Sequence, residues 1–200
     1  MGNGQLIANF ASEPFLVTEF MNIELSDGLV GIRRFRPEDV PLLFAAVRES
    51  INELSTSLTW CQVGCSIEQS AAFVSACDTD WEKGERYTFM IFDIKDHTFL
   101  GSVGLNHINR THGFANLDYW VRSSRTHQGI ASAAVRLLSR FGLHELGFNR
   151  IEIIAGTRNR PSQRVAEKAG AKREGILRNK IMLHGMPHDA VLYSLIAQDE

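Results

Sequence analysis

The chain has 200 residues, 44% of them apolar, so it can bury a sizeable core in one domain, and intrinsic disorder is excluded as its main state. The net charge of −2 argues against broad binding to nucleic acid or to a membrane surface, and no apolar run is long enough to cross a bilayer. The three cysteines lack a second ligand pair and indicate neither a disulfide framework nor a zinc site, so we expect a cytoplasmic protein without a metal.

The first half of the chain predicts an arm, a strand and two consecutive helices. Residues 1–28 show no sustained hydrophobic period and are interpreted as an N-terminal arm, which leaves residues 29–200 as one domain. Residues 29–35 are predicted to form a strand, and Pro37 opens a helix whose first turn is acidic. Ser66 is expected to cap a second helix.

The second half alternates strands with helices. A helix of about 17 residues is expected before Gly147, and a short one between Pro161 and Gly170. The predicted strands are 87–94, 99–108, 114–122, 150–155, 175–183 and 190–196, with residues 184–188 as a turn between the last two. This order predicts a mixed α/β (α+β) domain and not a run of βαβ units.

The segment from Tyr119 to Ala131 carries the first chemical signal. A strand leads through a polar loop directly into a helix, with Gly129 and Ala131 at the first turn. Unpaired N–H groups at a helix start bind phosphate oxygens, and small residues let those oxygens approach the backbone. The alternative interpretation is a strand-to-helix turn in which the glycine serves only the geometry.

The second signal is a basic segment that begins at Thr157. The net charge is −8 over residues 1–100 and +6 over residues 101–200, which favours a compact anionic ligand in the second half. The order of motifs resembles the GCN5-related N-acetyltransferase (GNAT) superfamily, in its RimJ/RimL-type branch, over roughly residues 25–197. The residues that carry this resemblance are Asn159, Ser162, Lys168, Gly170, Glu174, Gly175 and Arg178, with the pair Tyr119-Trp120 and the segment from Arg33 to Asp39.

The resemblance implies a single GNAT fold, with a central mixed, mostly antiparallel twisted sheet of about seven strands flanked by about four helices. It also implies acetyl-CoA as cosubstrate, with the pantetheine arm along the strand edge at Val121 and Arg122. Asn159 would hold an amide of that arm, and the basic cluster that includes Lys168 would serve the adenosine phosphates. The diphosphate would lie on the amides of Thr126, His127, Gln128, Gly129, Ile130 and Ala131.

The catalytic positions depart from the superfamily pattern. Asn116 stands where many members have a glutamate base, and Ala166 stands where a tyrosine often protonates the leaving thiolate. Asp118 lies on the same strand face as Asn116 and is the candidate base, with a surface or turn-capping carboxylate as the alternative. Ser162 is the candidate proton donor to the thiolate, with helix capping as the alternative.

The resemblance therefore implies an acetyl-CoA-dependent N-acetyltransferase that acts on a primary amine, by preference a protein or peptide N-terminus. A small amine such as a polyamine, aminosugar or amino acid is an alternative acceptor, and a non-catalytic acyl-CoA-binding module is the alternative from another class. A homodimer is compatible with the branch, whereas nucleic acid and membrane partners are not expected. Trp60, Trp81, Cys61 and Cys65 are interpreted as core residues.

Overall fold

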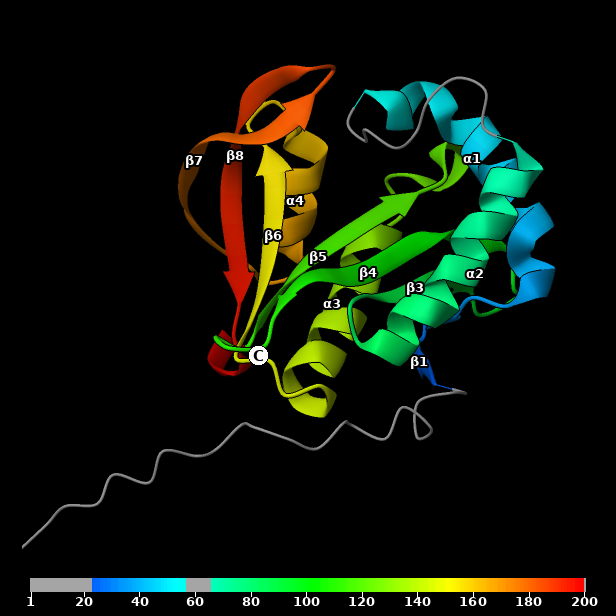
Figure 1. The fold of residues 1–200 in the computed structure, drawn as a ribbon, viewed down its shortest axis with the longest axis horizontal. Coiled ribbons are helices and arrows are strands. Elements are labelled where there is room, and N and C mark those ends of the chain that lie inside the picture. Colours follow the sequence, from blue (N-terminus) through cyan, green and yellow to red (C-terminus); the bar gives the residue numbers. More distant parts are fainter. Residues whose placement is uncertain (1–22, 57–65, 200) are drawn as a thin grey trace, which may run out of the picture.

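The computed structural model describes residues 23–56 and 66–199 (Figure 1). Within these residues, eight strands form one sheet in the order β1-β2-β3-β4-β5-β6-β8-β7. Every neighbouring pair is antiparallel except β5 and β6, which are parallel. The strands are β1 Glu24–Ser26, β2 Val30–Arg34, β3 Tyr87–Asp93, β4 Phe99–Asn109, β5 Phe114–Val121, β6 Arg150–Gly156, β7 Lys172–Leu183 and β8 Met186–Leu195. The predicted mixed, mostly antiparallel sheet is confirmed.

The sheet has one strand more than predicted, because β1 lies inside the range interpreted as an arm. Asp27 makes this possible, since its Oδ1 accepts hydrogen bonds from the N–H groups of Leu29 (3.0 Å) and Val30 (3.1 Å) and closes a tight turn between β1 and β2. Three residues are too few for a hydrophobic period to be visible in the sequence. Trp60, Cys61 and Cys65 lie outside the described residues.

The two C-terminal strands begin earlier than predicted. Strand β7 starts at Lys172 and β8 at Met186, so the turn between them is shorter than residues 184–188. His184 and Gly185 both have positive φ (49° and 76°) and form a two-residue hairpin connection. Most of β7 is exposed at the edge of the sheet, and because many of its side chains are polar, its first residues show no hydrophobic pattern that would predict a strand.

Four α-helices lie in the described part of the chain: α1 Val40–Ser55, α2 Ile67–Lys83, α3 Ile130–Arg140 and α4 Arg160–Lys168. The predicted cap is present, because Ser66 Oγ accepts a hydrogen bond from the N–H of Gln69 (3.3 Å). A π-helical turn, Phe141–Glu145, continues α3 almost to Gly147. None of the described helices has the length and apolar character needed to span a bilayer.

The helices cover both faces of the sheet (Figure 1). Alternate strand side chains divide the core into two clusters, so that Phe92 lies in the cluster with α1 and α2, whereas Phe89 lies in the cluster with α3. Trp81, near the end of α2, also reaches the second cluster and packs against Phe89. Val165 and Ala166 of α4 join the core on the α3 side. One face of the sheet is therefore bounded by α1 and α2 and the other by α3 and α4.

The parallel junction between β5 and β6 is short. Only Phe114, Ala115 and Asn116 of β5 pair with β6, at Arg150 to Glu152. Beyond Asn116 the two strands diverge (Figure 1), and β5 continues to Val121 with pairing to β4 alone. We call this divergence, between residues 117–121 and 153–156, the β5–β6 wedge.

Candidate active site

The loop that enters α3 offers unpaired backbone N–H groups at the end of the wedge. His127 and Gly129 both have positive φ (63° and 83°), and Thr126 to Gly129 are exposed. Among the residues that the structure describes, none accepts a hydrogen bond from the N–H of His127, Gln128 or Gly129. A Cβ on Gly129 would meet only Leu29 Cδ2, at 3.9 Å, so the space in front of the loop is open. Together with Ile130 and Ala131, which begin α3, these amides fit the oxygens of a diphosphate. The amide of Thr126, which was also predicted to bind it, instead donates to the carbonyl oxygen of Ser123 (3.4 Å).

The start of the loop is tied to α1. The N–H of Ser124 donates to Glu49 Oε1 (3.0 Å), and the N–H of Ser123 donates to Ser50 Oγ (2.9 Å). The guanidinium of Arg122 forms an ion pair with Glu49 and donates from Nη1 to the carbonyl oxygen of Phe99 (3.2 Å). The hydrogen bonds that Glu49 accepts, first that from Arg122 and then that from Ser124, lower the pKa of its carboxyl group to about 2. We call Glu49, Ser50 and Arg122 the loop clamp.

The free edge of β5 runs along the wedge. The N–H of Arg122 donates to Leu100 on β4 (2.9 Å), and backbone groups of successive strand residues point in opposite directions. The backbone groups of Val121 and Tyr119 therefore face away from β4, toward the wedge. Val121 can pair with an extended ligand as an added strand would. The backbone groups of Arg122 are already paired, because its N–H donates to β4 and its carbonyl oxygen accepts from the N–H of Arg125 (3.0 Å).

Ser162 lies at the opposite border of the wedge, in the first turn of α4. The cap of this helix is Asn159, whose Oδ1 accepts a hydrogen bond from the N–H of Ser162 (3.1 Å). The Ser162 hydroxyl is therefore not the cap, and its Oγ lies 2.8 Å from the hydroxyl oxygen of Tyr119. Lys168 lies in the last turn of α4, where its carbonyl accepts from Arg136 of α3 (3.4 Å). Somewhat less than two turns of helix thus separate Lys168 from Ser162.

A chain of polar side chains lies on the other face of β5, toward α1 and α2. Asn116 Nδ2 donates to Asn106 Oδ1 (2.9 Å), and Asn106 Nδ2 donates to Asp118 Oδ2 (2.8 Å). Arg86 Nη2 donates to the same Asp118 oxygen (2.7 Å). Asn116 Oδ1 is buried and has no hydrogen-bond partner among the described residues. A buried acceptor of this kind requires a donor, and an amine N–H is a suitable one.

The environment of Asp118 favours its proton-binding form. Desolvation raises the pKa of its carboxyl group, and the charges of Arg86 and His107 and the hydrogen bonds from Arg86 and Asn106 oppose that rise. The Asp118 side chain still exposes 44% of its surface, so water can reach its carboxyl group. Because both hydrogen bonds end on Oδ2, the described residues leave Oδ1 without a hydrogen bond.

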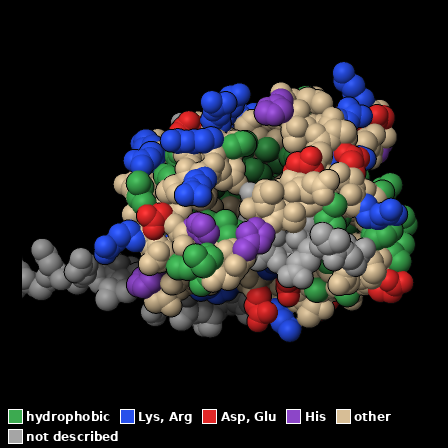
Figure 2. All heavy atoms as spheres, turned by 90° about the horizontal axis from the view of Figure 1, so that it is seen from above, with side chains coloured by type: hydrophobic (Ala, Val, Ile, Leu, Met, Phe, Trp, Pro, Cys, Tyr) green, Lys and Arg blue, Asp and Glu red, His purple; other side chains and the backbone are tan. Residues whose placement is uncertain are grey.

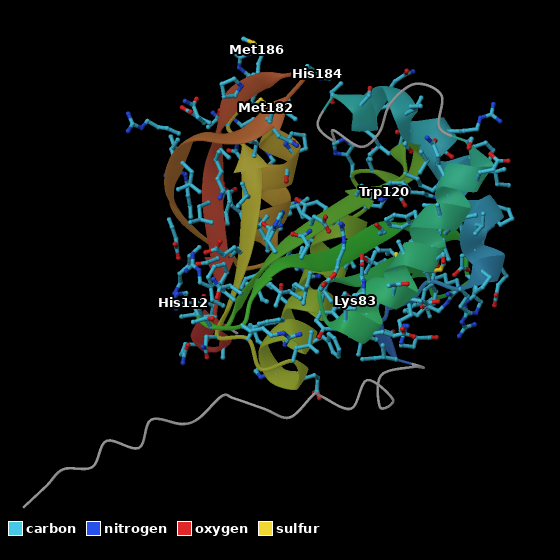
Figure 3. All side chains as sticks on the ribbon, in the orientation of Figure 1. Lys83, His112, Trp120, Met182, His184 and Met186 are labelled. Carbon is cyan, nitrogen blue, oxygen red and sulfur yellow. The ribbon has the colours of Figure 1, made fainter. Side chains whose placement is uncertain are left out.

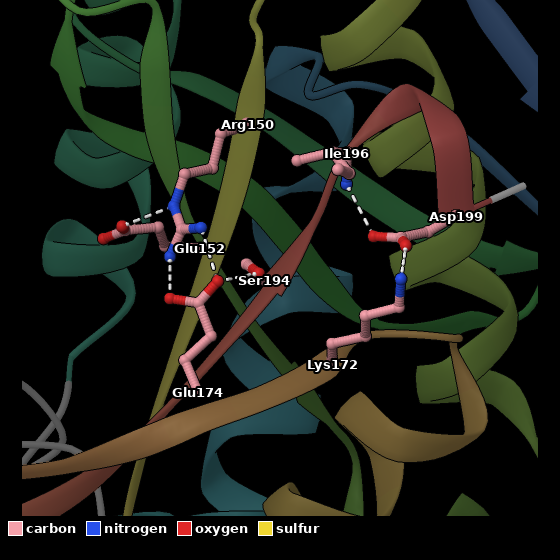
Figure 4. Close-up of polar contacts among 7 residues, drawn as sticks. All are labelled: Arg150, Glu152, Lys172, Glu174, Ser194, Ile196 and Asp199. Atoms are coloured by element: carbon pink, nitrogen blue, oxygen red, sulfur yellow. Dashed lines mark hydrogen bonds and ion pairs between the residues drawn. The ribbon is translucent and has the colours of Figure 1, made fainter.

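A second carboxylate on this face has no counterpart in the sequence-based prediction. Glu152 is the cross-strand partner of Asn116 and accepts a hydrogen bond from Arg150 Nε (2.8 Å). Arg150 also binds both carboxylate oxygens of Glu174, each at 2.6 Å (Figure 4), and holds the pKa of Glu174 at about 2. Period-two alternation along β6 could have placed Glu152 on the face of Asn116 only if the pairing of the strands had been known.

The surface around the wedge is unevenly charged. Figure 2 shows Lys and Arg side chains gathered on the side of α4 and the β7–β8 hairpin, where Arg158, Arg160 and Arg164 are exposed. Met182, His184 and Met186 lie at the tip of that hairpin, and Trp120 lies near the end of β5 (Figure 3). The cationic surface therefore lies beside the wedge on its α4 side.

Comparison with known proteins agrees with this geometry. The family model described as "Acetyltransferase (GNAT) domain" matches residues 30–172. "Probable N-acetyltransferase YjcK" of Bacillus subtilis (strain 168) is 36% identical over 60% of this chain and 66% of its own length, and "Ribosomal-protein-serine acetyltransferase" of Escherichia coli (strain K12) is 27% identical over 79% and 87%. The matched segment spans only 57% of "Putative ribosomal N-acetyltransferase YdaF" of Bacillus subtilis (strain 168).

Solved structures extend the comparison to the fold. A RimL ribosomal L7/L12 alpha-N-protein acetyltransferase in complex with coenzyme A superposes with a TM-score of 0.81 at 23% identity, over 89% of this chain and 100% of that one. A structure described as a putative ribosomal-protein-serine acetyltransferase from Vibrio cholerae has a TM-score of 0.74 at 27% identity, over 88% and 98%. The order of strands, the β5–β6 wedge and the family match together show that this chain belongs to the GNAT acetyltransferase family.

Proposed function

We propose that the protein is an acetyl-CoA-dependent N-acetyltransferase whose acceptor is the N-terminal α-amine of a protein or peptide. The observation that carries the proposal is the β5–β6 wedge. Its free strand edge runs along β5 from Asn116, whose buried Oδ1 has no partner among the described residues, toward the unpaired loop amides that follow Val121. Acetyl-CoA supplies a reactive thioester, and the residues of the wedge bind it, orient the amine and move protons.

On the cofactor side, the amides from His127 to Ala131 would bind the diphosphate, with the positive end of α3 behind them. Val121 would pair with the pantetheine arm. Asn159 would hold an amide of that arm and set the position of Ser162, which would protonate the departing sulfur. The cationic side chains on α4, with Lys168 at its end, would attract the phosphates of the adenosine moiety.

On the acceptor side, Asn116 Oδ1 would accept a hydrogen bond from the amine, and Asp118 Oδ1 would take its proton directly or through water. The raised pKa makes Asp118 a better base than an ordinary carboxylate. The α-amine suits such a site, because its pKa of about 7.7–8.0 leaves roughly 300-fold more neutral amine at pH 7 than the lysine pKa of about 10.4 does.

The test offers peptides that carry both a free N-terminus and an internal lysine. We expect acetyl-CoA-dependent thiol release and, by mass spectrometry, acetylation of the N-terminus in preference to the lysine. Predominant lysine acetylation would contradict the proposed acceptor class. Binding of CoA without thiol release, over a mixed panel of peptides and small amines, would instead support an acyl-CoA-binding module.

A further inference from the structure

The hydroxyl group of Tyr119 connects β5 to α4 across the wedge. Its oxygen lies 2.8 Å from Ser162 Oγ and 3.0 Å from the carbonyl oxygen of Ser162. The two residues are 43 positions apart in the chain, so the contact exists only through the tertiary fold. The side chain of Tyr119 packs against the core on the α3 side, which fixes the direction of its ring.

The number of hydrogens limits how this contact can work. The Tyr119 hydroxyl has one hydrogen, and the carbonyl oxygen of Ser162 can only accept. If Tyr119 donates to that carbonyl, Ser162 Oγ must donate to Tyr119, and the serine proton points away from a ligand. If Tyr119 donates to Oγ, the serine proton is free to point into the wedge. The two arrangements differ only in the rotation of two hydroxyl hydrogens.

The other groups of Ser162 do not compete for this hydrogen bond. The N–H of Ser162 is occupied by Asn159, and Tyr119 is the only hydrogen-bond partner of Ser162 Oγ among the described residues. Burial raises the pKa of Tyr119 to about 12 against the opposing hydrogen bond from Ser162. The phenol therefore keeps its proton throughout the neutral range and can always act as a donor.

We infer that Tyr119 is a positioning residue that turns the Ser162 proton toward the leaving sulfur during acetyl transfer. The inference rests on the proposed function. The amine nitrogen forms a bond to the acetyl carbon, and Asp118 takes a proton from that nitrogen. The bond between the acetyl carbon and sulfur breaks, its electron pair goes to sulfur, and sulfur takes the proton of Ser162. Serine oxygen then regains a proton from solvent while Tyr119 continues to donate its hydrogen bond, and Asp118 releases to solvent the proton that it took from the amine.

The test is a double-mutant cycle in steady-state kinetics. We expect Tyr119→Phe to lower kcat about tenfold and Ser162→Ala about 100-fold, with the KM for acetyl-CoA changed by less than about twofold in each. The double variant should equal Ser162→Ala, because the tyrosine acts through the serine. Tyr193→Phe is the matched control, since Tyr193 bonds Glu167 at the other end of α4 (3.1 Å) and should leave kcat nearly unchanged.

Each alternative gives a different result. Fully additive losses in the double variant, or an equal loss of kcat in Tyr193→Phe, would overturn the inference and leave Tyr119 as an anchor of α4. Unchanged kcat in Tyr119→Phe, with a wild-type protein that transfers acetyl groups, would also overturn it while the proposed function stands. A wild-type protein that binds CoA but releases no thiol would refute the proposed function itself.

Discussion

Replacement of Gly129 by alanine should separate the role of the loop in CoA binding from its role in folding. Gly129 has φ of +83°, a conformation that costs other residues about 1–2 kcal/mol. A Cβ there would meet only Leu29 at 3.9 Å, so no clash inside the protein adds to that cost. We expect Tm to fall by about 2–8 °C, since 1 kcal/mol shifts Tm by about 2–4 °C in a chain of this length.

Gly129→Ala should also reduce the rise in Tm that CoA produces. CoA at about 100 times its Kd should stabilise the wild-type protein by about 2.7 kcal/mol, which corresponds to a rise in Tm of about 5–11 °C. The methyl group would occupy space that phosphate oxygens use to approach the amides. If Kd rises tenfold, the same CoA concentration contributes about 1.4 kcal/mol, and the rise in Tm falls to about 3–6 °C.

Gly147→Ala provides the control in the same thermal-shift titration. Gly147 also has positive φ (70°) and no atoms near its absent Cβ, but it lies beyond the far end of α3. Its variant should lose similar stability and keep the full response to CoA. An undiminished response in Gly129→Ala, or equal losses of response in both variants, would refute the assignment of these amides to the diphosphate.

Three further predictions concern the rest of the site. Asp118→Asn should lower kcat/KM at neutral pH about 100-fold. In the wild type, kcat/KM should fall as pH drops through the raised pKa of Asp118, and the variant should lack this acidic limb of the pH profile. An equal loss in Glu152→Gln alone would identify Glu152 as the base. Glu49→Gln should destabilise the protein at neutral pH. Because the pKa of Glu49 is lowered in the folded state, the difference in Tm from the wild type should disappear as pH falls from about 4.5 toward about 2. A difference that persists at pH 2 would contradict the role of the loop clamp. Asn159→Ala should weaken CoA binding in calorimetry and lower Tm through loss of the cap, and an unchanged affinity would restrict Asn159 to capping.

The sequence predicts those features that depend on neighbouring residues. The start of α2 follows from Ser66 and Gln69, whose side chains satisfy each other's backbone N–H groups within four positions. The strand-to-helix loop at Gly129 is also local, and its positive φ agrees with the choice of glycine. Strand β1 cannot be predicted in this way, because its three residues pair with β2 through backbone groups that any sequence supplies.

Other features depend on contacts that only the folded chain brings together. The position of Arg122 in the loop clamp requires Glu49, which is 73 residues away. The contact of Tyr119 with Ser162 and the juxtaposition of Asn116 with Glu152 likewise depend on strand register and on the position of α4. A motif can therefore point to the residues of a site, but it cannot show which of them are already occupied by partners.

The three residue pairs between β5 and β6 have a consequence for local stability. Within residues 23–56 and 66–199 they are the whole backbone ladder between β1–β5 and the remaining strands, whereas seven pairs join β4 to β5. Beyond this ladder the backbone of β5 is bonded on one side only, and the amides of Tyr119 and Val121 should exchange with solvent deuterium faster than those of Asp118 and Trp120. An extended ligand along β5 would slow that exchange, so that the cosubstrate would act as a missing strand between β5 and β6.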